Sequence, residues 1–262
     1  MKYYSKKFPF SIILCIICIL LPATTQAQMF SIGDNSQERE RGIELFSMIG
    51  ASWEVAEFTY AGEGATDRER LDFSDSIFRF RFESQGLDLS LGFGGSLTGM
   101  DNTSYLNLSG RLFNSFPLTR SPSFMLLVPL QISSDLKQVR QNQSEAEFLQ
   151  SSLALGSGVS TIFKLGDRIG FNIKATPNYG FSFSQGSLFG GNLFRFDGKG
   201  LLFIDDLFGS NALSLGYHFD YRRYRIEGNL NDYDYTSHSV TCLLYRSPSP
   251  LDGLLSRMPS SA

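Results

Sequence analysis

The sequence predicts an all-β fold, an antiparallel up-and-down β-barrel that crosses a membrane with ten strands. Apolar and polar residues alternate with a period of two over most of the chain after residue 42, which is the pattern of β-strands. The apolar face is bulky and aromatic, whereas the other face carries glycine, serine, alanine and charged residues. Short turns that contain glycine alternate with longer polar loops, as in barrels that span a membrane.

The composition argues against a disordered chain, a helical membrane protein and a nucleic-acid-binding protein. The chain has 262 residues, of which 42% are hydrophobic and 14% are aromatic, and an aromatic share of this size argues against disorder. Its mean hydropathy of −0.08 excludes a membrane protein with many helical spans. The formal charge of −3 gives no sign of a nucleic-acid partner.

The first residues have the three parts of an export signal. Residues 1–7 are basic, residues 12–21 form an unbroken apolar run, and residues 25–27 are a small-x-small cleavage sequence. The apolar run is shorter than the ~20 residues that a spanning helix needs. The sequence therefore predicts a secretory signal peptide over 1–27, followed by a polar N-terminal segment over 28–42.

The clearest strand lies between Ile169 and Phe183, where every odd residue is apolar or Pro177 and every even residue is small or polar. It is longer than the five or six residues of a typical globular strand. The expected strands are 43–60, 73–83, 87–97, 103–114, 123–133, 147–164, 168–183, 198–208, 212–226 and 234–246. An even number agrees with a transmembrane barrel. Eight strands stays an alternative, because four of these segments alternate poorly.

The expected connections differ in length on the two sides of the barrel. The longer ones are 61–72, 98–102, 134–146, 184–197 and 227–233, and the turns are 84–86, 115–122, 165–167 and 209–211. The longer set would face outward and the turns would face the periplasm. The loop 184–197 is unusually apolar for a surface loop, so it is expected to fold into the barrel mouth or to contact a surface partner or lipid.

With these features the chain resembles bacterial outer-membrane β-barrel proteins of the small single-chain class, over residues 43–246. The resemblance implies an outer-membrane location, contact with outer-membrane lipid, and the barrel-assembly machinery as a partner during biogenesis. Such proteins usually end on an aromatic residue, for which Tyr245 is the candidate. The segment 247–262 departs from that pattern and is expected to be a C-terminal tail in the periplasm.

Tyrosines near the expected strand ends or outer faces are candidates for the aromatic girdles of a membrane protein. They are Tyr60, Tyr179, Tyr217, Tyr221, Tyr233, Tyr235 and Tyr245. Cys242 lies between Val240 and Leu244 on an apolar face, and we expect it to face lipid as a small hydrophobic residue.

Charged and polar side chains of several strands fall on the face expected to line the lumen. They are Arg79, Arg81, Asp88, Arg111, Lys174, His218, Asp220 and Arg222. One interpretation is an ion-selective channel. The other is a network of salt bridges that fills the barrel, which is favoured because both signs occur and because ten strands enclose little free space.

Three residues near the expected outer rim raise the question of catalysis: Asp232, Asp234 and His238. Outer-membrane proteases of the omptin type are similar in having ten strands, with Asp–Asp and Asp–His pairs at that rim. A histidine beside a carboxylate activates water. The second pair has no counterpart in this sequence, and a polar hairpin tip explains the three residues as well.

We therefore predict a non-enzymatic outer-membrane β-barrel with a role in envelope structure, surface interaction or passage of small solutes. No catalytic residue, cofactor or metal is expected, since two histidines and the cysteine outside the signal peptide supply no metal-ligand cluster. The alternatives are an outer-membrane enzyme, either an omptin-like protease or one that modifies lipid A, and a secreted soluble β-barrel that binds a ligand.

Overall fold

The computed structural model describes the barrel, which lies between residues 47 and 246. The described residues are 47–61, 71–84, 86–121, 123–142, 147–166, 168–184, 189–208, 211–226 and 231–246. The signal peptide expected over 1–27, the polar segment over 28–42 and the tail over 247–262 lie outside them. Among the described residues no helix is long and apolar enough to cross a membrane.

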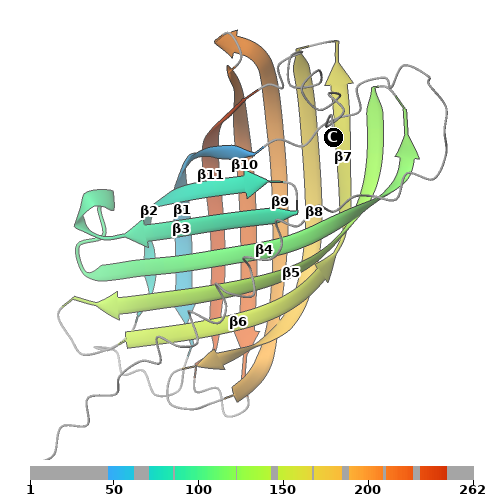
Figure 1. Ribbon diagram of the computed structural model, residues 1–262. Coiled ribbons are helices and arrows are strands. Elements are labelled where there is room, and N and C mark those ends of the chain that lie inside the picture. Colours follow the sequence, from blue (N-terminus) through green and yellow to red (C-terminus); the bar gives the residue numbers. More distant parts are fainter. Residues whose placement is uncertain are drawn as a thin grey trace, which may run out of the picture. The chain divides into compact units, whose positions relative to one another are not determined.

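The chain forms one closed antiparallel sheet (Figure 1). Its strands are β1 (Met48–Tyr60), β2 (Phe73–Ser84), β3 (Leu87–Gly94), β4 (Thr103–Arg120), β5 (Phe124–Gln141), β6 (Glu147–Ser157), β7 (Val159–Leu165), β8 (Ile169–Ser184), β9 (Phe189–Phe208), β10 (Asn211–Arg225) and β11 (Tyr233–Arg246). A short 3-10 helix, η2 (Ser96–Thr98), lies between β3 and β4. The last strand pairs with the first, and β4 pairs with β5, so the ring is complete.

The segments β6 and β7 occupy a single position in the ring. Both lie between β5 and β8: β6 pairs with β5 from Leu130 onward, and β7 pairs with the preceding part of β5. Gly158 separates them. A Cβ atom at Gly158 would lie 2.0 Å from the carbonyl oxygen of Ala175 on β8, so only glycine allows this close approach. The described chain is thus a barrel of ten positions.

The predicted fold class and the ten strands are confirmed, and the eight-stranded alternative is wrong. Several expected connections are also wrong. The loop 134–146 is mostly strand, because β5 continues to Gln141. The loop 184–197 is strand from Phe189 onward. The long turn 115–122 is largely a β-hairpin, since β4 continues to Arg120. In the first two cases polar or small residues on the inner face gave a strand the composition of a loop, and in the third Pro117 and Pro122 did so.

We call the two ends of the barrel the loop end and the turn end. The loop end joins β1 to β2, β3 to β4, β5 to β6, β8 to β9 and β10 to β11. The turn end joins β2 to β3, β4 to β5, β7 to β8 and β9 to β10, and there β1 begins and β11 ends. Both termini of the barrel therefore lie on the side of the shorter connections, as the pattern of loops and turns predicts.

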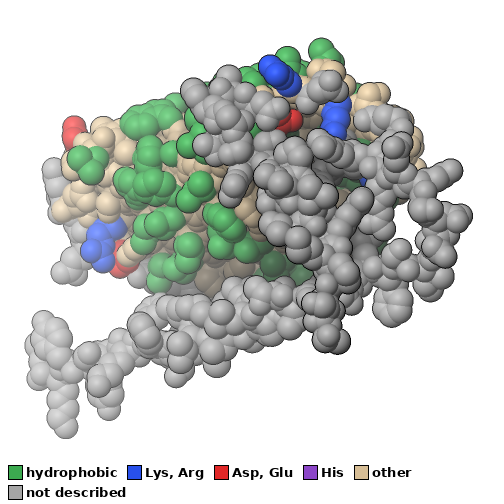
Figure 2. All heavy atoms as spheres, turned by 45° about the horizontal axis from the view of Figure 1, so that its top comes forward, with side chains coloured by type: hydrophobic (Ala, Val, Ile, Leu, Met, Phe, Trp, Pro, Cys, Tyr) green, Lys and Arg blue, Asp and Glu red, His purple; other side chains and the backbone are tan. Residues whose placement is uncertain are grey.

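The outer surface of the barrel is apolar between two polar borders. Large exposed apolar side chains include Ile49, Trp53, Val55, Phe80, Leu91, Leu108, Ile132, Leu155, Ile173, Leu215, Val240 and Leu244. Figure 2 shows such side chains covering the middle of one flank, with charged side chains toward its ends. Near the loop end the outward positions become polar, at Glu57, Ser74, Arg140 and Arg223. This belt on a closed sheet is the surface of a transmembrane barrel.

The belt gives a direct test of which residues face lipid. Val240 lies in the middle of the outward row of β11 and is 67% exposed. Val240→Arg should lower the free energy of unfolding in lipid vesicles by about 2–4 kcal/mol, because it places a charge near the bilayer midplane. Ser74→Arg, outward at the loop-end border, should cost about 0–1 kcal/mol. Urea titration measures both, and equal costs for the two variants would contradict this placement of the belt.

Candidate functional site

All eight side chains that the sequence places in the lumen lie on the inner face of the barrel. Arg79, Arg81, Asp88, His218 and Arg222 are buried, and Arg111, Lys174 and Asp220 are half-buried. They come from β2, β3, β4, β8 and β10. The structure brings most of them into one electrostatic network together with acidic and basic residues that the sequence reasoning missed.

Arg111 on β4 connects two sides of the barrel. Its guanidinium lies 3.2 Å from the carboxylate of Asp88 on the neighbouring β3. It also lies 2.8 Å from a carboxylate oxygen of Asp197, which belongs to β9 on another side of the ring. A single arginine therefore crosses the lumen and holds together strands that share no backbone hydrogen bonds.

Arg195 on β9 forms a second connection across the lumen. Its side chain is only 1% exposed, and it pairs with Asp135 of β5. It also donates to Asp220 of β10 at 2.7 Å and to Asp197 at 3.0 Å. Arg222 of β10 lies 3.2 Å from Asp135 and donates to Asp220 at 2.8 Å. Asp135 and Asp197 are thus each shared by two arginines and Asp220 by three, which suits charges that are removed from water.

Glu54 and Arg79 form a bidentate pair between the adjacent strands β1 and β2. The guanidinium donates to the two carboxylate oxygens at 2.7 and 3.1 Å, and its third nitrogen donates to Asn107 at 2.8 Å. The hydroxyl of Tyr235 donates to the same carboxylate. A Cβ atom at Gly92 on β3 would lie 3.0 Å from Cζ of Arg79. The glycine of β3 therefore makes room for the arginine of β2.

Two lysines complete the polar interior. Lys199 on β9 pairs with Glu83 on β2. Lys174 donates to the side-chain oxygen of Gln131 at 3.0 Å and lies over the ring of Phe113. We use the name ion-pair layer for Glu54, Arg79, Glu83, Asp88, Arg111, Asp135, Arg195, Asp197, Lys199, Asp220 and Arg222.

An aromatic cluster fills the barrel between this layer and the loop end. We call it the aromatic plug, and it consists of Phe58, Phe73, Tyr105, Phe148, Tyr233 and Tyr235 with the smaller apolar residues around them. The ring of Phe58 lies 5.2 to 5.7 Å from the rings of Phe73, Phe148 and Tyr233. Aromatic pairs at such distances contribute about 0.5–1.5 kcal/mol each beyond their burial.

The plug corrects the expectation of aromatic girdles. Tyr179 and Tyr217 are exposed on the outer face, where a girdle requires them. Tyr233, Tyr235 and Tyr245 instead are buried inside the barrel. Their hydroxyls explain the difference, because each finds a partner there. Tyr233 donates to Gln150 at 2.5 Å, Tyr235 donates to Glu54, and Tyr245 donates to Asp205 at 2.5 Å.

Lys137 joins the aromatic plug to the ion-pair layer. Its side chain is fully buried, and its Nζ has no hydrogen-bond partner among the described residues. The Nζ atom instead lies 4.0 Å from the ring centre of Tyr235 and 4.7 Å from that of Tyr233. Lys137 is therefore held by ring faces rather than by a carboxylate.

The sequence reasoning missed seven of these charged residues: Glu54, Glu83, Asp135, Lys137, Arg195, Asp197 and Lys199. Asp135 and Lys137 lie in the segment expected to be the loop 134–146, and Arg195 and Asp197 lie in the expected loop 184–197. Glu54 lies in the first strand, where the alternation is weak. A signal was present, because these charges stand two residues apart, as Asp135 and Lys137 do and as Arg195 and Asp197 do, which is the spacing of one face of a strand.

The three candidates for catalysis at the rim form no catalytic pair: Arg225 bridges Asp232 and Asp234, at 3.7 and 2.6 Å, and His238 contacts neither carboxylate. Asp232 is buried and accepts a hydrogen bond from the backbone nitrogen of Ile226 at 2.8 Å. Asp234 points outward and binds Arg225 at 2.6 Å. His238 is exposed on the outer face, with its Nδ1 2.5 Å from the hydroxyl of Tyr217. Among the described residues no Asp–His pair forms at this rim.

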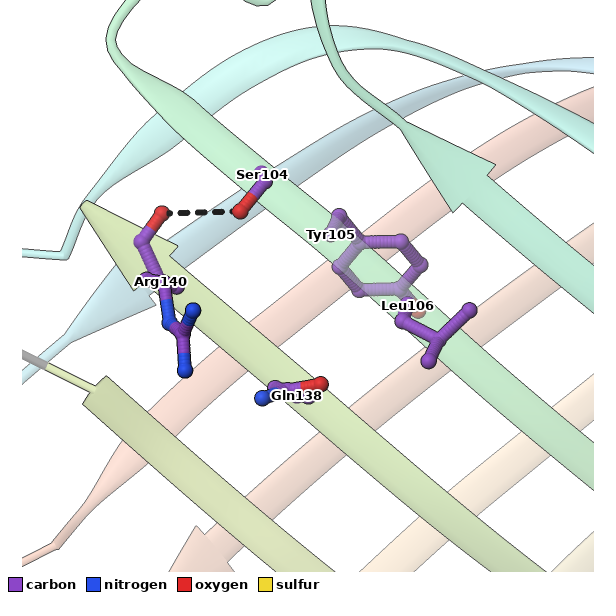
Figure 3. A pocket seen from close by; sticks show the side chains of 5 residues that line it. All are labelled: Ser104, Tyr105, Leu106, Gln138 and Arg140. Carbon is purple, nitrogen blue, oxygen red and sulfur yellow. Dashed lines mark hydrogen bonds between the residues drawn. The ribbon is translucent and has the colours of Figure 1, made fainter. Parts of the chain in front are cut away.

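A shallow pocket of about 110 Å³ lies between β4 and β5 near the loop end (Figure 3). It is lined by Ser104, Tyr105, Leu106, Gln138 and Arg140, and Ser104 donates to the carbonyl oxygen of Arg140 at 3.4 Å. It holds no carboxylate, histidine or cysteine, so it lacks an acid–base pair. The described part of the chain also contains no group of three residues fit to bind a metal ion.

No protein-family model matches the chain, and no curated protein matches it in sequence. Solved structures of bacterial outer-membrane proteins are similar to it. The outer membrane protease OmpT from Escherichia coli has a TM-score of 0.41 and 7% identity, over 77% of this chain and 95% of that one. The translocator domain of the autotransporter NalP from Neisseria meningitidis has a TM-score of 0.38 and 8% identity, over 77% and 88%. The Pseudomonas putida toluene transporter TodX has a TM-score of 0.22 and 6% identity, over 78% and 90%.

Substitutions in the pair of Glu54 and Arg79 test how much a buried ion pair contributes to the free energy of unfolding. Arg79→Met leaves a buried carboxylate without its cation and should cost about 3–5 kcal/mol of unfolding free energy in urea titrations. Combining it with Glu54→Leu should recover most of that cost, since both charges are then gone. Arg140→Met, which removes an exposed pair with Glu147, should cost at most about 1 kcal/mol. Equal costs for Arg79→Met and Arg140→Met would show that the buried pair is not required.

Proposed function

We propose that this chain is a non-enzymatic barrel of the bacterial outer membrane whose interior is filled, and that it acts as a structural or surface-presenting element of the envelope. The observation that carries the proposal is the set of ion pairs across the lumen. Arg111, Arg195 and Lys199 each bind a carboxylate from a strand that is not their neighbour in the ring. Side chains that span the lumen leave little space for a solute.

The aromatic plug supports the same proposal from the loop end. A porin keeps a water-filled interior. Here a cluster of buried rings closes the same region, and Lys137 and Tyr235 connect it to the ion-pair layer. Passage of a solute would have to separate ring contacts and buried ion pairs together. Passage of small solutes is therefore the less favoured role.

An enzymatic role has no support in the side-chain geometry of the described rim. His238 faces the outer belt, where Tyr217 and Phe219 surround it, and Asp234 is held by arginines. A hydrolytic pair would need the histidine and a carboxylate within hydrogen-bond distance and open to substrate. The apolar belt also supports a barrel in a membrane over a secreted soluble binder, because a soluble barrel would expose polar side chains there.

Recording in planar lipid bilayers tests the proposed filled barrel. The refolded protein should insert without uniform conductance steps in concentrated potassium chloride, because no open water column crosses the ion-pair layer. A porin in the same lipid serves as the positive control, and retention of the heat-resistant folded form on gels confirms that the sample is folded. Reproducible steps of one size from the folded protein would overturn the proposal in favour of a channel.

A further inference from the structure

The outer face of the barrel changes from apolar to charged over a short distance where β4, β5 and β6 lie side by side. In the belt, Leu108 of β4 is directly opposite Leu136 of β5, and both side chains are exposed. Four residues closer to the loop end, Ser104 is opposite Arg140. On the other side of β5, Glu147 of β6 is opposite Arg140. A molecule that lies along these strands therefore contacts leucine side chains at one end and charged side chains at the other.

The shallow pocket between β4 and β5 lies at this border (Figure 3). Leu106 lies on its apolar side, directly opposite Gln138. The side chains of Gln138 and Arg140 extend from β5 beside each other. Its volume of about 110 Å³ is several times what one water molecule needs. The structure thus has free space on the outer face, at the level where the apolar belt meets its polar border.

Most of the hydrogen-bonding capacity of Arg140 is unused. Its side chain is 57% exposed, and its one salt bridge within the described residues is the contact with Glu147 at 3.5 Å. A guanidinium carries five N–H donors in a planar fork, which matches the oxygens of a phosphate group. Arg140 can therefore bind a phosphate with donors that no other described residue occupies.

Glu147 supplies the opposite charge beside the pocket. Its carboxylate accepts a hydrogen bond from the amide of Gln138 and is 25% exposed, and an ionised carboxylate has acceptor sites for further donors. On the loop-end half of this three-strand outer face, Arg140 and Glu147 are the charged side chains. One charge of each sign does not favour a net anion. It matches a ligand that itself carries one negative and one positive charge.

We propose that this three-strand patch binds one membrane lipid whose head group combines a phosphate with a primary amine, as in phosphatidylethanolamine. The phosphate lies against Arg140, the ammonium lies against Glu147, and an acyl chain follows Leu106 and Leu108 into the belt. A choline head group has no N–H donor for the carboxylate, and a glycerol head group has no cation. The inference rests on the proposed placement in a membrane, and it adds a selective lipid site to the outer wall of the barrel.

Native mass spectrometry of the folded protein in detergent tests the selectivity. Phosphatidylethanolamine, phosphatidylglycerol and phosphatidylcholine with identical acyl chains are offered at equal concentrations. One phosphatidylethanolamine should be retained several-fold more than either competitor, a modest preference because exposed ion pairs are weak. Arg140→Gln should lower the retention of all three lipids to a common level. Glu147→Gln should make phosphatidylethanolamine and phosphatidylcholine equal.

Arg223→Gln is the matched control. Arg223 is also 57% exposed at the loop-end border, and it lies 3.4 Å from Asp234. Asp234 is already bound by Arg225 at 2.6 Å, so it is not available to an ammonium. This variant should keep the full preference for phosphatidylethanolamine. The heat-resistant folded form on gels confirms that each variant is folded before its lipids are compared.

Two results would overturn the proposal. One is equal retention of the three lipids by the wild-type protein, and the other is equal retention of phosphatidylethanolamine by the wild-type protein and Arg140→Gln. Soluble O-phosphoethanolamine, which has the head group without acyl chains, should not displace the lipid at the same concentration, and displacement would contradict the role of the leucines. All of these residues lie on the outer wall, so none of these results alters the conductance test of the filled barrel.

Discussion

The packing inside this barrel depends on one constraint, namely that charges inside a narrow closed sheet must find partners inside it. The interior holds many arginines and carboxylates, and a ring of ten strands offers them little water. Arg195 shows the solution, since it is nearly inaccessible and contacts Asp135, Asp197 and Asp220 from three different strands. Such ion pairs join strands on different sides of the ring. They therefore stabilise the closed barrel, and the closed barrel in turn holds the paired side chains together.

The small residues of the inner face follow from the same constraint. Long side chains such as Arg79 and Arg111 occupy the lumen only where neighbouring strands offer glycine or serine. Gly92 gives space to the guanidinium of Arg79, and Ser52 and Ser239 give both space and acceptors to Arg81. The outer face has the opposite requirement, since it contacts lipid and carries bulky apolar residues. Large apolar and small polar residues therefore alternate along each strand because one face contacts lipid and the other faces the polar interior.

Much of the architecture can be predicted from that alternation. The strand from Ile169 to Ser184 was predictable almost to the residue, because its inner face consists of small and polar side chains that contrast with the apolar outer face. The continuations of β5 and β9 were not, because Asp135, Lys137, Arg195 and Asp197 together resemble the composition of a loop. The partner of each buried charge is still harder to predict from the sequence, since only the closed ring brings Arg111 to Asp197 and Tyr235 to Glu54. Whether a tyrosine points to lipid or to the lumen depends on a partner for its hydroxyl, which a single strand does not reveal.

The central claim is that the ion-pair layer and the aromatic plug keep bulk water out of the lumen. Labelling of single cysteines tests it most directly, in a chain whose native cysteines are replaced by serine. Ser133→Cys is on the inner face of β5 at a position that is 2% exposed, and Ser96→Cys is at an exposed position beyond β3. A membrane-impermeant maleimide should modify the second cysteine at once and the first only after unfolding in urea. Equal labelling rates in the folded protein would contradict the account, because they would show that water and solutes reach the middle of the barrel.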